Sequence, residues 1–513
     1  MSNPTEKSEK DMNNLSEKKH SEAVITDTEK GTNEDLSFSP TEKRNIILYI
    51  LGIMCFKFAY ETLGTSISLF AQDRYAKNVA LTMTPVLTSA FTIVQCVCAI
   101  AGAQLVVHFR TNVLLAASIF TFGVFAALLI IVDEATSGHW NPLWIFVLYL
   151  PMGGCLGIIE LIRRIIPRDI VGENPIKLRR MDANVHIFYE IAGTAGAFTS
   201  TATVKTLGYI KALLLMPILF TLAAGIWFMI KLNPNNSDLK KSNPDGTPAY
   251  SGKKKSLFAL YFYSVKRGAY IIFSERRFIW LVPGYVVALV FHRFVEGVLS
   301  PTFAKQILNE GSYNGILLAG SNFGELCGAL AVLVLATKIH TPIPWVRYDA
   351  FALLTLWIYP YLPVTSAIAW VWTAFPILMV LSAGWAAGDV SLAAYIQSRL
   401  HSSHGKDDQG TSPLGCVMAF LYCSYIVIYA ALSIPMGRVF DAYKARGNTR
   451  EAFIYVAGVM ATIGSVIIFS CTFIPKGSFA LNPKVDPRDE IAEEEIEEPA
   501  KGSANLIAAI SMG

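Results

Sequence analysis

Long apolar segments, each able to cross a lipid bilayer, are the feature that most constrains this fold. A helix needs about 20 mostly apolar residues to span the hydrocarbon core. Only 16% of the 513 residues are charged, against about 25% in soluble proteins. The sequence therefore predicts an all-α membrane protein with twelve transmembrane helices, at about 45–71, 80–107, 112–133, 142–163, 183–204, 209–231, 278–303, 313–337, 348–364, 367–397, 414–437 and 452–474.

The twelve segments divide into two groups of six. Residues 45–232 hold the first group, and residues 278–475 hold the second. We expect residues 233–277 to form a cytoplasmic loop that ends in an amphipathic helix, SLFALYFYSVKRGAYIIF. Residues 1–44 and 476–513 are polar and rich in charge, which predicts a disordered tail at each end, the second one acidic.

Lysine and arginine are concentrated in the loop after the fourth segment and in the central loop. By the positive-inside rule, these loops and both termini face the cytoplasm. The loop after the eleventh segment disagrees, because it carries Arg438, Lys444, Arg446 and Arg450 on the opposite side. The larger imbalance favours cytoplasmic termini. We expect the plasma membrane as the location, with a vacuolar or other endomembrane as the alternative.

Charged residues interrupt two of the apolar segments near their middle. The stretch FKFAYETLGTSISLFA contains Lys57 and Glu61, and FHRFVEGVLSPTFA contains His292, Arg293 and Glu296. Each stretch places a basic residue four positions before a glutamate, a spacing that brings the two side chains onto one helix face. A charge in hydrocarbon is costly, so such residues usually form pairs or line a wet cavity.

The two stretches also align with each other along the chain. Phe56 matches Phe291, and a GxxxG pattern at Gly153–Gly157 recurs at Gly384–Gly388. The separation in residue number between matching positions is similar in the two cases. The second group of six helices is therefore predicted to repeat the first.

A duplicated chain with a long central loop resembles the major facilitator superfamily over residues 45–475. That resemblance implies two pseudo-symmetric six-helix halves that rock about a site at the membrane midplane. The segment GAQLVVHFRTN keeps Gly102 and Arg110 of the superfamily pattern G-x-x-x-D-R-x-G-R-R but lacks its aspartate. GTAGAF, from Gly193, matches the antiporter pattern only without its proline. Residues 163–198 resemble a poorly characterised fungal group within the superfamily.

In that superfamily the first, fourth, seventh and tenth helices line the central cavity, which would place the mid-membrane charges there. Glu61 and Glu296 are candidate proton carriers together with the histidine, while the basic residues would hold an anionic group. Glu325 is either a second protonatable site or a partner of Arg293. The alternative is that all of these charged residues form structural ion pairs and take no part in transport. The predicted substrate or proton pathway comprises Lys57, Glu61, His292, Arg293, Glu296, Glu325 and Asn322.

A second polar set lies at the inner ends of the predicted helices. Inner-end clusters of this kind are more often gating ion pairs than substrate ligands. The cytoplasmic gate candidates are Glu160, Arg163, Arg164, His186, Glu190 and Asp389.

These features favour a secondary active transporter that moves a small organic solute by alternating access, coupled to a proton or another ion and acting as a monomer. The alternative is a non-transporting sensor or scaffold on the same fold. The sequence has no nucleotide-binding loop, no nucleophile motif and no paired metal-ligand spacing among its histidines and cysteines. We therefore expect no enzyme activity, no cofactor and no metal, and the net charge of +4 does not suggest a nucleic-acid partner.

Overall fold

The computed structural model describes residues 38–172, 175–232, 257–335, 338–339, 341–400 and 413–483. Within these ranges the chain forms only helices, turns and short connections. Most of the two predicted tails and residues 233–256 of the central loop lie outside the described residues.

The first group of helices, called here the N-terminal bundle, is built around one hydrophobic core. Trp227, Phe220, Phe122 and Phe56 are fully buried in it and form a chain of aromatic contacts. Its helices are α2 (Pro40–Arg74), α3 (Ala80–His108), α4 (Thr111–Ala135), α5 (Trp144–Val171), α6 (Pro175–Leu207), α7 (Tyr209–Ala212) and α8 (Leu215–Phe228).

The second group, called the C-terminal bundle, has a separate core that includes Phe303, Tyr359 and Phe453. Helix α10 (Leu257–Ser274) precedes it in the chain. The bundle comprises α11 (Arg276–Ile279), η1 (Val282–Val286), α12 (Val287–Phe294), η2 (Val295–Leu299), α13 (Ser300–Gln306), η3 (Gly311–Tyr313), α14 (Asn314–Leu335), α15 (Ile343–Leu353), η4 (Leu354–Tyr361), α16 (Ile368–Leu400), α17 (Pro413–Ala445), α18 (Thr449–Phe453), η5 (Ile454–Val459) and α19 (Met460–Cys471).

Ten helical segments of the described chain are long and apolar enough to cross a membrane. Two further segments fall outside this set for different reasons. Helix α6 is 33 residues long but carries several charged residues, and α15 is only 11 residues long before the chain tightens into the 3-10 helix η4. The protein is therefore an integral, multi-pass membrane protein.

The first helix begins at Pro40, earlier than the boundary near residue 45 expected from hydrophobicity. Ser39 forms a capping box, in which its hydroxyl accepts a hydrogen bond from the backbone of Glu42 at 3.2 Å. The Glu42 carboxylate in turn accepts one from the Ser39 backbone at 2.7 Å. Pro40 suits the first helical position because its fixed φ is helical and its missing N–H is not needed there. Local capping thus extends the helix into the predicted tail.

The chain after α19 also remains ordered for longer than the predicted boundary at residue 476. The buried guanidinium of Arg347 on α15 donates hydrogen bonds to the Ser478 and Ala480 carbonyls. It also bonds the Thr472 hydroxyl at 3.0 Å. Residues up to 483 therefore pack against α15 and close that end of the C-terminal bundle.

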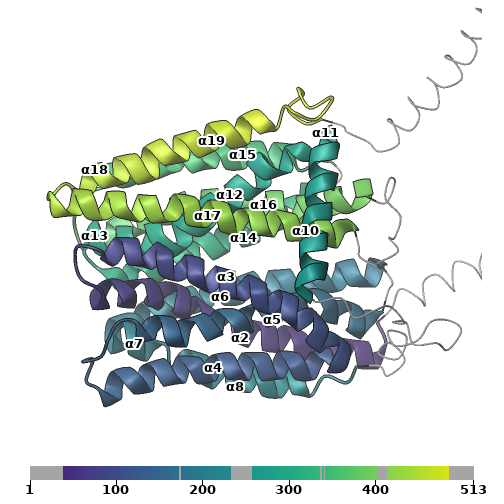
Figure 1. Ribbon diagram of the computed structural model, residues 1–513, viewed down its shortest axis with the longest axis horizontal. Coiled ribbons are helices and arrows are strands. Elements are labelled where there is room, and N and C mark those ends of the chain that lie inside the picture. The colour runs from purple at the N-terminus through teal and green to yellow at the C-terminus, as the bar shows by residue number, and fades with distance from the viewer. Residues whose placement is uncertain are drawn as a thin grey trace, which may run out of the picture.

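The two bundles lie side by side, and α10 runs across one end of them (Figure 1). From α10, the Tyr261 hydroxyl contacts Cys96 of α3 at 3.4 Å and also Cys423 of α17. The helix therefore touches both bundles. All eight cysteines of the chain are free.

Helices α6 and α14 pack tightly where the bundles meet. A side chain on Gly315 would place its Cβ 2.6 Å from the Ala197 carbonyl oxygen, so only glycine permits this approach. Ala197, Leu318 and Ala319 form a small buried apolar contact beside it. The close approach brings polar residues of α6 within reach of α14.

The bundles are also joined at the end of the molecule where α2 terminates, called here the far end. Pro301 has no N–H with which to bond the Gly297 carbonyl four residues earlier. The Ser68 hydroxyl of α2 donates to that carbonyl at 2.8 Å. Nearby, Lys305 forms an ion pair with Asp73 across the bundles.

A third contact at the far end fixes the start of α3. The residue preceding this helix, Val79, makes no side-chain cap. Instead, the Asp441 carboxylate of α17 accepts hydrogen bonds from the backbone N–H groups of Leu81 and Thr82 at 3.1 and 2.8 Å. It also accepts one from the Thr82 hydroxyl at 2.6 Å. An acceptor from one bundle thus caps a helix of the other.

Candidate functional site

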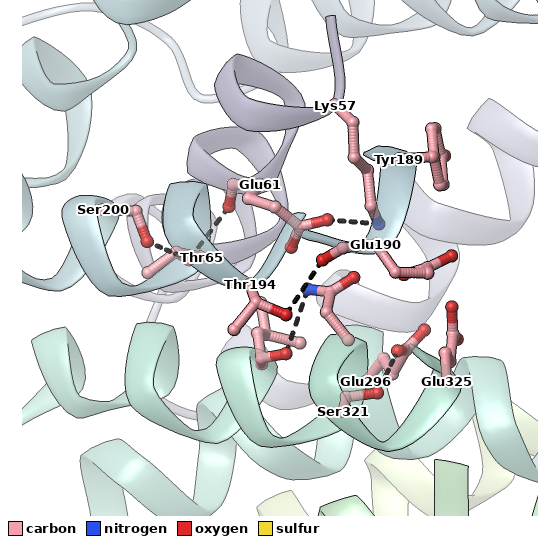
Figure 2. Close-up of polar contacts among 12 residues, drawn as sticks. Lys57, Glu61, Thr65, Tyr189, Glu190, Thr194, Ser200, Glu296, Ser321 and Glu325 are labelled. Atoms are coloured by element: carbon pink, nitrogen blue, oxygen red, sulfur yellow. Dashed lines mark hydrogen bonds and ion pairs between the residues drawn. The ribbon is translucent and has the colours of Figure 1, made fainter. Parts of the chain in front are cut away.

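Lys57 and Glu61 form a buried ion pair in the middle of α2. The Lys57 ammonium lies 2.5 Å from a Glu61 carboxylate oxygen, and both side chains are about nine-tenths buried. Figure 2 shows the pair pointing toward the C-terminal bundle. The ammonium also lies 4.8 Å from the centre of the Tyr189 ring on α6, an attractive cation–π arrangement.

The C-terminal bundle contributes a second charged group. His292 Nε2 lies 3.4 Å from a Glu296 oxygen and 3.0 Å from a Glu325 oxygen. Arg293 pairs with Glu296 at 3.3 Å, and the Ser321 hydroxyl donates to the same carboxylate at 2.5 Å. Glu325 therefore contacts His292 directly rather than forming the ion pair with Arg293 that was one of its two expected roles.

Backbone irregularity positions this second group. Glu296 lies in η2, a single π-helical turn between α12 and α13. A π turn widens the helix by one residue and is frequent at functional sites. The widened turn precedes Pro301, where a regular helix would also lose a hydrogen bond.

Helix α6 joins the two charged groups. Glu190 lies near the middle of α6 because that helix already begins at Pro175, so it is not at the inner end where the sequence placed it. Its side chain is 1% exposed and interacts electrostatically with Lys57 and Glu325. One turn away, a Cβ on Gly193 would lie 2.6 Å from Lys57 Cε and 2.8 Å from Asn322 Oδ1. Lys57 of the N-terminal bundle and Asn322 of the C-terminal bundle thus both lie against the surface of Gly193.

These residues form one contiguous group between the bundles, called here the central polar cluster; Figure 2 labels its members Lys57, Glu61, Glu190, Glu296 and Glu325. Four of its members carry carboxyl groups, while only Lys57 and Arg293 carry a fixed positive charge. Most of the cluster is buried, but the Arg293 side chain is 55% exposed and marks its open side. The cluster comprises Lys57, Glu61, Glu190, His292, Arg293, Glu296 and Glu325.

The remaining gate candidates include one ion pair, Glu160–Arg163. Arg163 bonds Glu160 at 2.6 Å and the Tyr189 hydroxyl at 3.3 Å, so Tyr189 lies between this pair and Lys57. Arg164 is exposed. His186 is half-buried, and its Nε2 has no hydrogen-bond partner among the described residues.

Asp389, the last gate candidate, interacts electrostatically with His186, which in turn interacts with Arg163. It lines a small cavity of the C-terminal bundle together with Tyr285, Trp385 and Asp349. Sequence reasoning did not single out Asp349, a buried carboxyl on α15. Its position near the start of a predicted membrane helix, two residues after Arg347, was the signal available for it.

The structure also brings potential metal ligands together, although the sequence showed no such spacing. One ligand atom each from His292, Glu296 and Glu325 lie within 4.8 Å of one another. The sequence separates Glu325 from the other two by a helix connection, so the group becomes visible only in the structure, where the Glu325 side chain of α14 reaches His292 of α12.

No known protein family matches the sequence, and no curated protein matches it. Solved structures do match. A point mutant of the nucleoside transporter NupG aligns with a TM-score of 0.59 at 12% identity, over 85% of this chain and 100% of that one. A POT family transporter in complex with 5-aminolevulinic acid gives 0.58 at 12% identity, over 83% and 96%. A D-xylose-proton symporter gives 0.55 at 13% identity, over 84% and 98%.

These alignments cover nearly the whole length of each solved transporter and most of this chain. At this identity the likeness concerns the fold and not the substrate. The chain therefore shares the fold of these solved transporters.

Proposed function

We propose that this protein is a secondary active transporter that moves a small organic solute by alternating access, driven by a proton gradient. One observation carries the proposal: a buried group of charged residues lies where the two bundles meet. Charges in a membrane protein are costly unless they pair or take part in transport. A scaffold without transport would gain nothing from unbalanced carboxyls in its interior.

The contacts at the far end support the alternating-access part of the proposal. Asp73, Ser68 and Asp441 each hold one bundle to the other there through polar contacts. The Asp73–Lys305 ion pair is partly exposed, so it can break and reform in water at low cost. The hydrogen bonds of Ser68 and Asp441 are buried and hold the far end closed in this conformation. The exposed side of Arg293 provides the access route to the cluster in this conformation.

Within the cluster we assign distinct roles to the two kinds of charge. Glu61, Glu296, His292 and Glu325 take up and release protons, while Lys57 and Arg293 attract the anionic part of the solute. Asn322 contacts the solute from α14. The Glu160–Arg163 pair acts as a gate with Arg164, His186 and Asp389 at its margins. Glu190 belongs to the central site.

We extend the proposal to the architecture. Helices α2–α8 form one half with six spans and α11–α19 the other, with α6 and the α15–η4 segment as the fifth and ninth spans. Both termini then face the cytoplasm, and the plasma membrane is the site of action. The protein works as a monomer.

The transport test can be carried out before the solute is identified. Purified protein is reconstituted into liposomes, a cell metabolite extract is added outside, and a pH gradient of either sign is imposed. Mass spectrometry then compares the contents with those of protein-free liposomes. We expect at least one solute to accumulate in a gradient-dependent manner, and a protonophore to abolish this accumulation.

The carboxyl variants Glu61→Gln and Glu296→Gln should lose uphill accumulation while folding normally. Glu134→Gln is the matched control, because this half-exposed carboxylate only pairs with Lys211 at the surface. The absence of any protein-dependent solute would instead favour a sensor or scaffold. Normal accumulation in both cluster variants would remove the cluster from the mechanism.

A further inference from the structure

The central polar cluster has an excess of negative charge that the protein itself does not balance. Glu61, Glu190, Glu296 and Glu325 supply four carboxylates against the two cations Lys57 and Arg293. Arg163 does not relieve the imbalance, because it already pairs with Glu160 at 2.6 Å. Two uncompensated charges in a buried site are strongly unfavourable. The site must therefore take up two protons or one divalent cation.

The chemistry of His292 points to a cation at one position. Among the described side chains, its Nε2 contacts the oxygens of Glu296 and Glu325. A neutral imidazole nitrogen without hydrogen accepts hydrogen bonds, as carboxylate oxygens do. The nitrogen and the two carboxylates therefore need a proton or a metal ion between them.

The distances suit a metal ion. Zinc binds histidine nitrogen and carboxylate oxygen at about 2.1 Å, so tetrahedral ligand atoms lie about 3.4 Å apart. The two nitrogen–oxygen distances are 3.0 and 3.4 Å, and all three atoms fall within 4.8 Å.

A fourth ligand is available from the other bundle. Glu190 is 1% exposed, and its Oε2 has no hydrogen-bond partner among the described residues. In Figure 2 its side chain extends toward Glu325, with which it also interacts electrostatically. Glu190 lies next to Glu325 but outside the group of three ligand atoms, so its side chain must rotate toward the ion to become the fourth ligand.

We propose that His292, Glu296, Glu325 and Glu190 form a binding site for one divalent transition-metal ion of the Zn²⁺ and Mn²⁺ class. One imidazole and three carboxylates suit these ions better than thiolate-seeking metals. The ion enters from the exposed side of Arg293. Because α6 supplies Glu190 while α12, η2 and α14 supply the other ligands, a bound ion holds the bundles together.

Metal binding is measured on the purified full-length protein, so the result does not depend on transport. After removal of any histidine tag and of bound metal by a chelator, Zn²⁺ is titrated by calorimetry and Co²⁺ by its visible absorption. We expect one ion per chain. His292→Gln and Glu325→Gln should each weaken binding at least 100-fold, and Glu190→Gln about 10-fold, as the ligand from the opposite bundle.

Glu134→Gln is the matched control, since this half-exposed carboxylate pairs with Lys211 away from the ligand group and should leave binding unchanged. If a ligand variant fails to fold, pulsed electron paramagnetic resonance of Mn²⁺ bound to the wild type provides a second measurement. It should detect an imidazole nitrogen at the metal. No stoichiometric binding by the wild type, no imidazole signal, or equal affinity in folded ligand variants would each overturn the proposal.

Discussion

The Lys57–Glu61 pair allows a quantitative test of how this protein tolerates charge in its interior. At 2.5 Å the attraction is about 7 kcal/mol at an effective dielectric constant of 20, and desolvation of both groups offsets much of it. Removal of one partner leaves the other charge buried, which typically costs about 3–5 kcal/mol. The charged neighbours of the pair predict that removing Lys57 and removing Glu61 lower the free energy of unfolding by different amounts.

Lys57→Met should be the more damaging change. It deprives Glu61 of its partner and leaves Glu190 and Glu325 without the nearby cation that they share. We expect a loss of about 3–5 kcal/mol in the free energy of unfolding. Glu61→Gln should cost about 1–3 kcal/mol, because Lys57 retains Glu190 and Glu325 as neighbours. The double variant should be more stable than Lys57→Met alone, with a coupling energy of about 2 kcal/mol.

Reversible unfolding in mixed micelles of detergent and dodecyl sulfate measures these free energies. The half-exposed Glu134–Lys211 pair, 3.1 Å apart, provides the control cycle, with an expected coupling below about 1 kcal/mol. The reasoning fails if the two buried changes add within about 0.5 kcal/mol. It also fails if Glu61→Gln is the costlier single change.

Two further predictions concern the contacts between the bundles. Gly193→Val should abolish transport while the protein still reaches the membrane, because the valine side chain would displace Lys57 and Asn322. Gly225→Val is the control, since no atom lies within 4 Å of a Cβ at that position. Uptake measurements that find both variants active would contradict this prediction. Asp441→Ala should remove the cap of α3, at a cost of about 1–2 kcal/mol, and open the far end. Faster labelling of a cysteine placed at Thr82 would report that opening, and an unchanged rate would argue against it.

The sequence was most informative where a property is local. The lengths of the apolar segments predicted an integral membrane protein of helices, and the spacing of Lys57 and Glu61 on one helix face is enough to explain their ion pair. The capping box at Ser39 was also a local signal, which a boundary set by hydrophobicity alone missed.

Contacts between helices could not be predicted in the same way. The approach of Glu190 to Lys57 depends on the early start of α6 and on the rotation of that helix. The bond between His292 and Glu325 depends on how α14 and α12 are placed within the C-terminal bundle. Such contacts depend on tertiary packing between segments that are far apart in the sequence, and a single sequence carries no record of that packing.

The central claim is that the two bundles must separate at the far end during each transport cycle. Asp73→Cys and Lys305→Cys place one thiol on each bundle, at positions where the native side chains form an ion pair. A bifunctional thiol reagent that joins them should arrest the gradient-dependent accumulation expected in liposomes, and reduction should restore it. Joining Glu134→Cys to Lys211→Cys, both within the N-terminal bundle, should leave accumulation intact. Full transport with the two bundles joined at the far end would contradict the account.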